Sequence, residues 1–343
     1  MDFGSLDLNT TWFVLLGVLF TGYAMLDGFD LGVGALHLFT KTDEERRTLL
    51  NAIGPVWDGN EVWLVTGGGA LFAAFPMVYA TVFSGFYLAF VLLLVALIFR
   101  AVAIEFRSKQ PMRWWRQMWD VGFSAGSVVS SLLIGVAMGN IAWGVPLDER
   151  GEYAGTFLDL LHPYALLLGI TTVALFSMHG AIYAVMKTEG ELHEKLRGWV
   201  NHAIIFFIIC YAVTTMATLI YVPHMAARVR GNPWLFSVAV LNMLAIANIP
   251  REIHYGRDGR AFVSSCVAMI ALMGLFGLEM YPNLVLSNPD MAHSLTIHNA
   301  ASSHKTLGIM LTIALIGAPI VLAYTVSIYW IFRGKVRLNS MSY

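Results

Sequence analysis

The sequence predicts an all-α, polytopic integral membrane protein with nine transmembrane helices. Hydrophobic residues make up 57% of its 343 residues and charged residues only 13%, whereas soluble domains carry about 25% charged residues. The mean hydropathy is +0.67. The apolar residues also gather into long segments, on the scale of the roughly 20 residues that a helix needs to cross the hydrocarbon core. A chain this long and this apolar is expected to cross a membrane many times.

Nine such segments follow one another along the chain. The second and third are divided only by Phe75-Pro76, which predicts a tight turn between antiparallel neighbours, because proline interrupts a helix. The seventh is short and is bounded by Pro233 and Pro250. In chain order the predicted helices are 9–38, 55–74, 77–104, 119–143, 158–186, 199–222, 233–249, 261–282 and 305–332.

The distribution of basic residues supports this number of helices and orients them. If nine helices alternate in direction, 17 of the 21 basic residues fall on one face of the membrane. The other face receives only Arg150, Arg228, Arg230 and Lys305. Positive charge marks the cytoplasmic side of a membrane protein. The N-terminus is therefore predicted to lie outside and the C-terminus in the cytoplasm.

A weak internal similarity indicates how the chain is divided. Lys41-Thr42-Asp43 leads to Asn51-Ala52-Ile53, and Lys187-Thr188-Glu189 leads to Asn201-His202-Ala203-Ile204. This pattern fits two four-helix units related by a parallel repeat; chance similarity between two charged loops is the alternative. The predicted organisation is a single membrane domain, 1–332, with units 1–143 and 158–282, an appended ninth helix 305–332 and a cytoplasmic tail 333–343.

Acidic residues gather at the predicted cytoplasmic end of the first helices. Asp27 and Asp30 lie in the cytoplasmic half of the first helix, three residues apart and therefore on one face. Asp58 and Glu61 fall in the first two turns of the second helix with the same spacing, and Arg100 is near the end of the third. A charged side chain at the bilayer centre costs roughly 2.5–3.5 kcal/mol on insertion scales, so these groups are not expected to face lipid.

These acids allow a structural and a functional interpretation. Each could be structural, because a helix N-terminus favours the carboxylates of Asp58 and Glu61 and Arg100 could pair with either acid of the first helix. One arginine cannot neutralise four carboxylates, however, so the surplus must be protonated, hydrated or part of a proton route. Together with Asp120 at the start of the fourth helix, the cluster is predicted to take up protons from the cytoplasm.

The remaining polar residues do not indicate another chemistry. Cys210 and Cys266 lie inside apolar segments and make neither a disulfide framework nor a metal site. His179 and His202 lie singly in predicted helices; one histidine could ligate a haem iron, but nothing singles one out. No metal site is expected, and the net charge of −1 implies no nucleic-acid partner.

Several motifs together resemble one known family, subunit II of the cytochrome bd-type quinol oxidases. The resemblance covers nearly the whole chain, is densest before about residue 143, and is far more specific in combination than in any single fragment. The motifs that carry it are Asp27-Gly28-Phe29-Asp30-Leu31-Gly32-Val33-Gly34, Trp57-Asp58-Gly59-Asn60-Glu61-Val62-Trp63, Gly67-Gly68-Gly69-Ala70-Leu71-Phe72-Ala73-Ala74-Phe75-Pro76, Phe99-Arg100, Phe106-Arg107-Ser108-Lys109, Met118-Trp119-Asp120, Gly135-Val136-Ala137-Met138-Gly139-Asn140, Ser294-Leu295-Thr296 and Ser302-Ser303.

The resemblance implies a nine-helix subunit that works beside a haem-bearing subunit I in a bacterial or archaeal cytoplasmic membrane. Such a complex oxidises quinol, reduces oxygen to water and generates membrane potential by taking protons from the cytoplasm. In the family, two b-type haems, one d-type haem and the main quinol site belong to subunit I, so this chain is not expected to ligate haem or to be catalytic alone. The resemblance leaves room for a bound quinone in this chain and for a small single-helix subunit.

The resemblance also implies roles for individual residues. Asp58, Glu61 and Asp30 would carry protons toward the oxygen-reducing haem of the partner, with Arg100 tuning their charge. Trp63 could border an oxygen path, with simple packing as the alternative. The outer connection 223–233 is shorter than in some relatives, which leaves the choice between menaquinol and ubiquinol open. Asp27 and Asp120 complete the predicted proton pathway.

Two functions from other classes compete with this one. A proton-coupled transporter also uses buried carboxylates, although the repeat is predicted to be parallel and no matched pair of broken helices is evident. A purely structural scaffold with an inert acid cluster is the other alternative.

Overall fold

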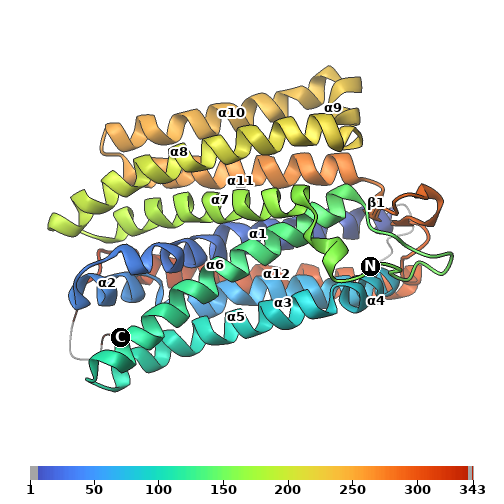
Figure 1. Ribbon diagram of the computed structural model, residues 1–343. Coiled ribbons are helices and arrows are strands. Elements are labelled where there is room, and N and C mark those ends of the chain that lie inside the picture. The colour runs from blue at the N-terminus through green and yellow to red at the C-terminus, as the bar shows by residue number, and fades with distance from the viewer. Residues whose placement is uncertain (1–6, 339–341, 343) are drawn as a thin grey trace.

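The computed structural model describes residues 7–338 and 342, and it is built almost entirely of helices. Figure 1 shows them as a bundle of long, roughly parallel rods. Within the described residues the helices are α1 (Leu8–Leu36), α2 (Asp43–Ile53), α3 (Trp57–Ala74), α4 (Pro76–Gly85), α5 (Tyr87–Phe106), α6 (Arg113–Trp143), α7 (Pro163–Lys187), α8 (Gly190–Tyr221), α9 (Ala227–Gly231), α10 (Pro233–His254), α11 (Asp258–Met280) and α12 (His304–Ile331).

Eight helices of the described chain are long and apolar enough to cross a membrane. The predicted second span forms α3 as an 18-residue helix but is not among the eight, since Asp58, Asn60 and Glu61 lower its hydropathy. The chain is thus a multi-pass membrane protein. All nine predicted spans are helical, but the third, 77–104, is divided at Phe86 into α4 and α5. The eight that qualify are α1, α5, α6, α7, α8, α10, α11 and α12.

The two ends of the bundle differ in what caps them. The short helix α2 lies at one end, and the strands β1 (Asn283–Val285) and β2 (Leu295–Thr296) lie at the other (Figure 1). These are called the α2 end and the sheet end below. The antiparallel pair β1–β2 departs from the all-α prediction, because two short segments of the connection between α11 and α12 pair with each other. Helix α1 runs through the middle of the bundle and packs on α3, α6, α7 and α11.

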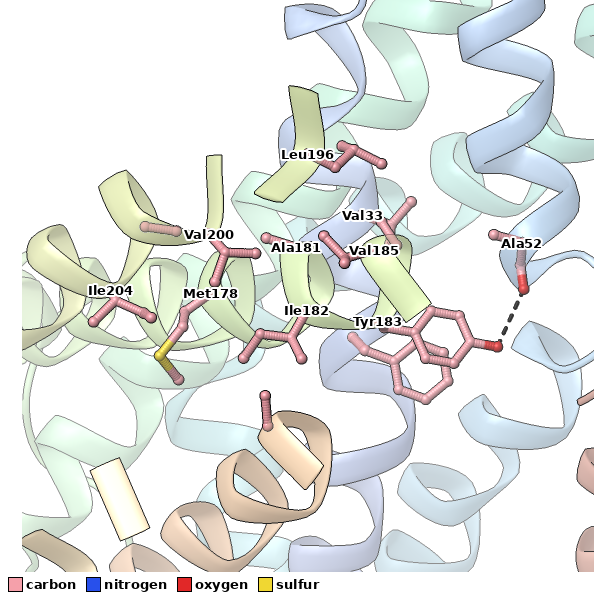
Figure 2. Packing of buried hydrophobic residues seen from close by; sticks show 14 of the residues in the cluster. Val33, Ala52, Met178, Ala181, Ile182, Tyr183, Val185, Leu196, Val200 and Ile204 are labelled. Atoms are coloured by element: carbon pink, nitrogen blue, oxygen red, sulfur yellow. Dashed lines mark hydrogen bonds between the residues drawn. The ribbon is translucent and has the colours of Figure 1, made fainter. Parts of the chain in front are cut away.

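The centre of the hydrophobic core lies where α1, α7 and α8 meet near the α2 end. Figure 2 shows Val33 of α1 beside Ala181, Tyr183 and Val185 of α7. The Tyr183 hydroxyl donates to the carbonyl of Ala52 in α2 at 3.2 Å, so α2 is fixed to the core and is not a free loop.

Helix α2 was not expected from hydropathy, because it is too polar and short to span a membrane. Its start has a local cause. The Thr42 hydroxyl accepts from Glu45 N at 3.1 Å, and the Glu45 carboxylate accepts from Thr42 N at 3.3 Å. This reciprocal capping box satisfies two backbone donors at the helix start. The same motif, read from the sequence, could have predicted the helix.

Several predicted boundaries are corrected by the structure. Helix α7 begins at Pro163, preceded by a 3-10 turn over Leu158–Leu161 in place of the expected helix start at 158. Helix α10 continues through Pro250 to His254: proline removes one backbone donor, but the helix lies within its last turns there and Tyr255 N still bonds to Arg251 O at 3.1 Å. The break at Phe75 is confirmed, with Pro76 opening α4.

Helices α1 and α7 cross at two glycines that allow their backbones to touch. A Cβ built on Gly32 would lie 1.8 Å from the carbonyl oxygen of Phe176, and one on Gly180 would lie 2.4 Å from the backbone of Gly32 and Val33. No other residue type fits at this crossing without moving a helix. Of the predicted tail 333–343, residues 333–338 and 342 are described, and Val336 N donates to the Lys187 carbonyl at 2.9 Å.

Candidate functional site

Three helices bring together the charged residues that the sequence singled out. Asp27 and Asp30 project from one face of α1, and both are 0% exposed. Arg100 reaches them from α5 and is also 0% exposed. Its Nη2 lies 2.7 Å from Asp27 Oδ1 and 3.9 Å from Asp30 Oδ2. Its Nη1 donates to Glu61 of α3. One guanidinium therefore serves three carboxylates, and these four residues are called the Arg100 network below.

The network continues to two residues that sequence reasoning missed. Asn60 Nδ2 donates to Asp30 Oδ2 at 2.7 Å and to the Leu26 carbonyl at 3.1 Å. Tyr329 of α12 donates its hydroxyl to Asn60 Oδ1 at 2.9 Å. Asn60 stands between two noted acids in the chain, so its position was a usable signal. Nothing in the sequence around Tyr329 pointed to this contact.

Several polar atoms of the network keep free hydrogen-bonding capacity. Among the described residues, Asp27 Oδ2, Asp30 Oδ1 and Arg100 Nε are buried and have no hydrogen-bond partner. Buried polar groups are paired in the great majority of cases. Two adjacent carboxylates that each keep one open oxygen can bind a proton there, which is chemistry that a fully paired salt bridge does not offer.

The carboxylates differ in their access to the surface. Asp58, in the first turn of α3, is exposed. The Glu61 side chain, one turn further, is 25% exposed, whereas Asp27 and Asp30 are fully buried. Asp58 is three residues from Glu61 in α3 but is not bonded to the Arg100 network, since no hydrogen bond of its side chain is found in the described part of the chain. The acids therefore form a series of increasing depth.

Asp120 belongs to a separate group, which corrects the prediction of one common cluster. It lies in the N-terminal part of α6, which begins at Arg113 and not at the predicted residue 119, and it is 1% exposed. His37 Nε2 lies 2.6 Å from its Oδ1, Arg46 Nη1 2.7 Å from its Oδ2 and Arg107 Nε 2.5 Å from its Oδ1. Arg107 also binds Asp43 at 2.8 Å. The sequence correctly placed Asp120 at the α2 end of the bundle but could not show that basic residues surround it.

Trp63 of α3 packs against α1 at Gly22. A Cβ on Gly22 would stand 2.3 Å from the Trp63 ring. The indole therefore fills the space left by a glycine, and it contributes packing between α3 and α1.

The fold and this site define a class: a polytopic helical membrane protein that keeps an arginine and three carboxylates inside its bundle. A family model described as cytochrome bd terminal oxidase subunit II matches residues 8–332. The chain is 38% identical to cytochrome bd-I ubiquinol oxidase subunit 2 of Escherichia coli K12, over 96% of this chain and 95% of that one. It is 35% identical to cytochrome bd ubiquinol oxidase subunit 2 of Bacillus subtilis 168, over 96% and 97%.

A solved structure has the same fold. The bd oxidase from Geobacillus thermodenitrificans superposes with a TM-score of 0.77 at 16% identity, over 96% of this chain and 98% of that chain. The protein belongs to the cytochrome bd terminal oxidase subunit II family. It is thus a subunit of a terminal quinol oxidase, a haem-containing quinol:O2 oxidoreductase in which subunit I is its partner. This membership decides against the transporter alternative.

The two histidines that the sequence analysis considered for a haem, His179 and His202, have different surroundings. His179 is fully buried, but its Nδ1 lies 2.7 Å from Ser265 Oγ and its Nε2 2.9 Å from the Met25 carbonyl, so both ring nitrogens are engaged. His202 lies on the exposed side of α8. Within the described residues, no group of three or more His, Cys, Asp or Glu side chains could hold a metal ion.

Proposed function

We propose that the Arg100 network takes up protons from the cytoplasm for the oxygen chemistry of the partner subunit. The observation that carries this proposal is the contact of one buried guanidinium with Asp27, Asp30 and Glu61. Removing an ion from water costs several kcal/mol, so a surplus of buried negative charge can be relieved only by protons or water. A group that must share protons is suited to passing them on.

The depth of the acids gives the proposed direction. Asp58 is exposed and would collect protons at the surface. Glu61, partly exposed and bonded to Arg100, would pass them to the buried pair Asp27 and Asp30. Arg100 would keep the local charge balanced while each proton moves. Asp120 has three basic partners of its own, and we assign it to anchoring the α2 end instead of conduction.

The complex supplies the redox chemistry. We infer that the partner, subunit I, carries two b-type haems, one d-type haem and the main quinol site, in a bacterial cytoplasmic membrane. The relatives from Escherichia coli and Bacillus subtilis are named ubiquinol oxidases, which favours a quinol of that class here. A quinone bound in this chain and a small single-helix subunit remain compatible with the fold. The residues of the Arg100 network would bind, hold and move protons only.

We also infer the topology that the proposal needs. Nine helices would cross the membrane, namely the eight candidate spans and α3. The α2 end would lie in the cytoplasm, and α1 would begin outside. Helices α1, α3, α5 and α6 would form one unit, α7, α8, α10 and α11 the second, and α12 would be appended. The concentration of basic residues at the α2 end supports this orientation.

One face of α3 is proposed as part of the contact with subunit I. Its exposed positions recur every three or four residues and combine Asp58, Thr66 and Gly69 with the apolar Val62, Val65 and Phe72. Polar and small residues on a helix suit a protein neighbour better than lipid. A Cβ on Gly69 meets nothing within 4 Å in this chain, so Gly69→Leu should fold normally yet lose the haem-bearing partner. Gly274→Leu on α11, equally unobstructed, is the control. Trp63 is proposed to border an oxygen path.

The proton proposal is tested in the intact oxidase with Asp58→Asn, Glu61→Gln and the double variant. Loss of oxygen consumption with normal haem content is the expected result, with Glu44→Gln, an exposed acid at the same end, as control. Loss of haem and of assembly together would favour the structural alternative. Full activity in all three variants would remove both acids from the mechanism.

A further inference from the structure

Tyr329 of α12 ends a line of hydrogen bonds that starts at Asp30 of α1. The Tyr329 hydroxyl lies 2.9 Å from Asn60 Oδ1. Asn60 Nδ2 lies 2.7 Å from Asp30 Oδ2 and 3.1 Å from the Leu26 carbonyl oxygen. Side chains of α1, α3 and α12 therefore meet at one amide, and that amide is 1% exposed.

These contacts allow only one orientation of the Asn60 amide. The Leu26 carbonyl and the Asp30 carboxylate are acceptors, so the group that faces them must be the NH2 of Asn60. A flipped amide would place Oδ1 against two acceptors. Asn60 Oδ1 then faces α12, where it can only accept, and the Tyr329 hydroxyl must donate to it.

The fixed amide makes the two oxygens of Asp30 unequal. Oδ2 already receives an N–H, and a proton bound there would oppose that donor. Oδ1 is buried and has no hydrogen-bond partner in the described part of the chain. The proton therefore has one favourable position on Asp30, at Oδ1.

We propose that Tyr329 is a positioning residue for proton uptake, holding Asn60 so that Asp30 accepts its proton at Oδ1. In this step an O–H bond forms at Oδ1 and the carboxylate loses its charge; transfer onward breaks that bond and restores the charge. The inference rests on the proposed function of the Arg100 network. It gives α12 a role in that network, although its apolar stretch is the least buried of the eight candidate spans, at 11%.

The test uses the intact oxidase and a variant that removes only one hydroxyl. Tyr329→Phe keeps the ring that packs at the edge of the core. Tyr324→Phe is the matched control, because Tyr324 lies on the same helix and is 65% exposed. Turnover is measured per haem, so that only assembled complexes count. Infrared difference spectra report the protonated carboxyl of Asp30, which is identified by its disappearance in Asp30→Asn.

Tyr329→Phe is expected to lower turnover per haem about two- to tenfold, the range of one net hydrogen bond, and to shift the Asp30 carboxyl band. Tyr324→Phe should change neither. If Tyr329 acts through Asn60, the substitution should have no further effect in an Asn60→Ala background.

The outcomes separate this inference from the proposal beneath it. If Asp30→Asn is inactive while Tyr329→Phe has normal turnover and an unshifted Asp30 carboxyl band, the role of Tyr329 is overturned and the proposed proton route is not. Additive effects of Tyr329→Phe and Asn60→Ala would overturn it as well, as would failure of Tyr329→Phe to assemble, which would assign the residue to packing. Full turnover in Asp30→Asn would instead remove Asp30 from the proton route.

Discussion

Arg107, directly after α5, binds Asp120 in the N-terminal part of α6 with two nitrogens, Nε at 2.5 Å from Oδ1 and Nη2 at 3.3 Å from Oδ2. A two-point contact between a guanidinium and a carboxylate fixes orientation as well as distance. Because Arg107 also binds Asp43 of α2 at 2.8 Å, three helices are joined at the α2 end. This group and the Arg100 network are built from the same residue types, yet the first is rich in donors and the second in acceptors.

Asp120→Asn should therefore lower the stability of the protein and should not selectively lower its rate of oxygen consumption. Arg107 and Arg46 would lose a buried counter-charge, and breaking such a pair costs roughly 3–5 kcal/mol. The expected result is a lower melting temperature and less co-purifying haem. A variant that assembles like the parent but turns over slowly would return Asp120 to the proton pathway.

Substitutions of Arg100 should distinguish charge from geometry. Arg100→Lys keeps the charge but offers one nitrogen in place of the two that contact Asp27 and Glu61, because an ammonium lacks the planar fork. We expect reduced oxygen consumption at near-normal haem content. Arg100→Met leaves two buried carboxylates and the partly exposed Glu61 without a cation and should prevent assembly. Equal behaviour of the two variants would show that the fork has no special role.

The glycine crossing of α1 and α7 can be tested within one helix. Gly32→Ala places a Cβ 1.8 Å from the Phe176 carbonyl oxygen and should destabilise the protein by at least about 1–3 kcal/mol, the usual effect of overpacking. Gly17→Ala, which meets nothing within 4 Å, should be neutral or stabilising by up to about 1 kcal/mol. Thermal unfolding of the purified complex measures both. A stable Gly32→Ala would mean that the crossing is looser than described.

The ion pair of Glu45 with Lys195 predicts part of the pH dependence of stability. Lys195 Nζ lies 2.8 Å from Glu45 Oε1. Burial acts to raise the pKa of Glu45, but the hydrogen bonds from Lys195 and from the backbone of Lys41 and Thr42 outweigh it and hold the pKa below its ordinary value of 4.5. Because the folded pKa is the lower one, the stabilisation is complete above the ordinary value and is lost as the pH falls through the folded pKa.

Glu45→Gln should accordingly flatten the acid side of a plot of melting temperature against pH. The effect at neutral pH should stay below about 1 kcal/mol, since both side chains are partly exposed. Glu44→Gln, on the same turn but exposed, should leave the slope unchanged. An unchanged slope in Glu45→Gln would dismiss the pair as a source of acid sensitivity.

Much of the fold could be predicted because spanning helices are encoded by composition over about 20 residues. Every predicted span contains a helix, although α2 and α9 were not predicted, and Arg100 was correctly matched with Asp27 or Asp30 from their depth. Helix α3 shows the limit of hydropathy: the same Asp58 and Glu61 that mark the site make the helix too polar to qualify as a span.

Other features depend on contacts between distant segments, and the sequence could not supply them. The division of the acids into two groups depends on His37, Arg46 and Arg107 converging on Asp120. The contact of Tyr329 with Asn60 joins residues 269 positions apart. Depth along a helix predicts which residues share a level, whereas rotation about the helix axis, set by packing, decides which of them meet.

In α1, α5 and α6 the Asp, Glu, Lys, Arg and His side chains all lie in the half nearest α2; α1 carries none of them from Leu8 to Leu26 and α5 none from Tyr87 to Phe99. The half of each of these helices nearest the sheet end therefore has no charged side chain that could pass on a proton. If the proposed proton uptake holds, hydrogen ions admitted at the α2 end would meet no continuing series of acids along these three helices toward the sheet end. They would then leave laterally, toward the neighbouring polypeptide, without discharging the voltage across the membrane through this subunit.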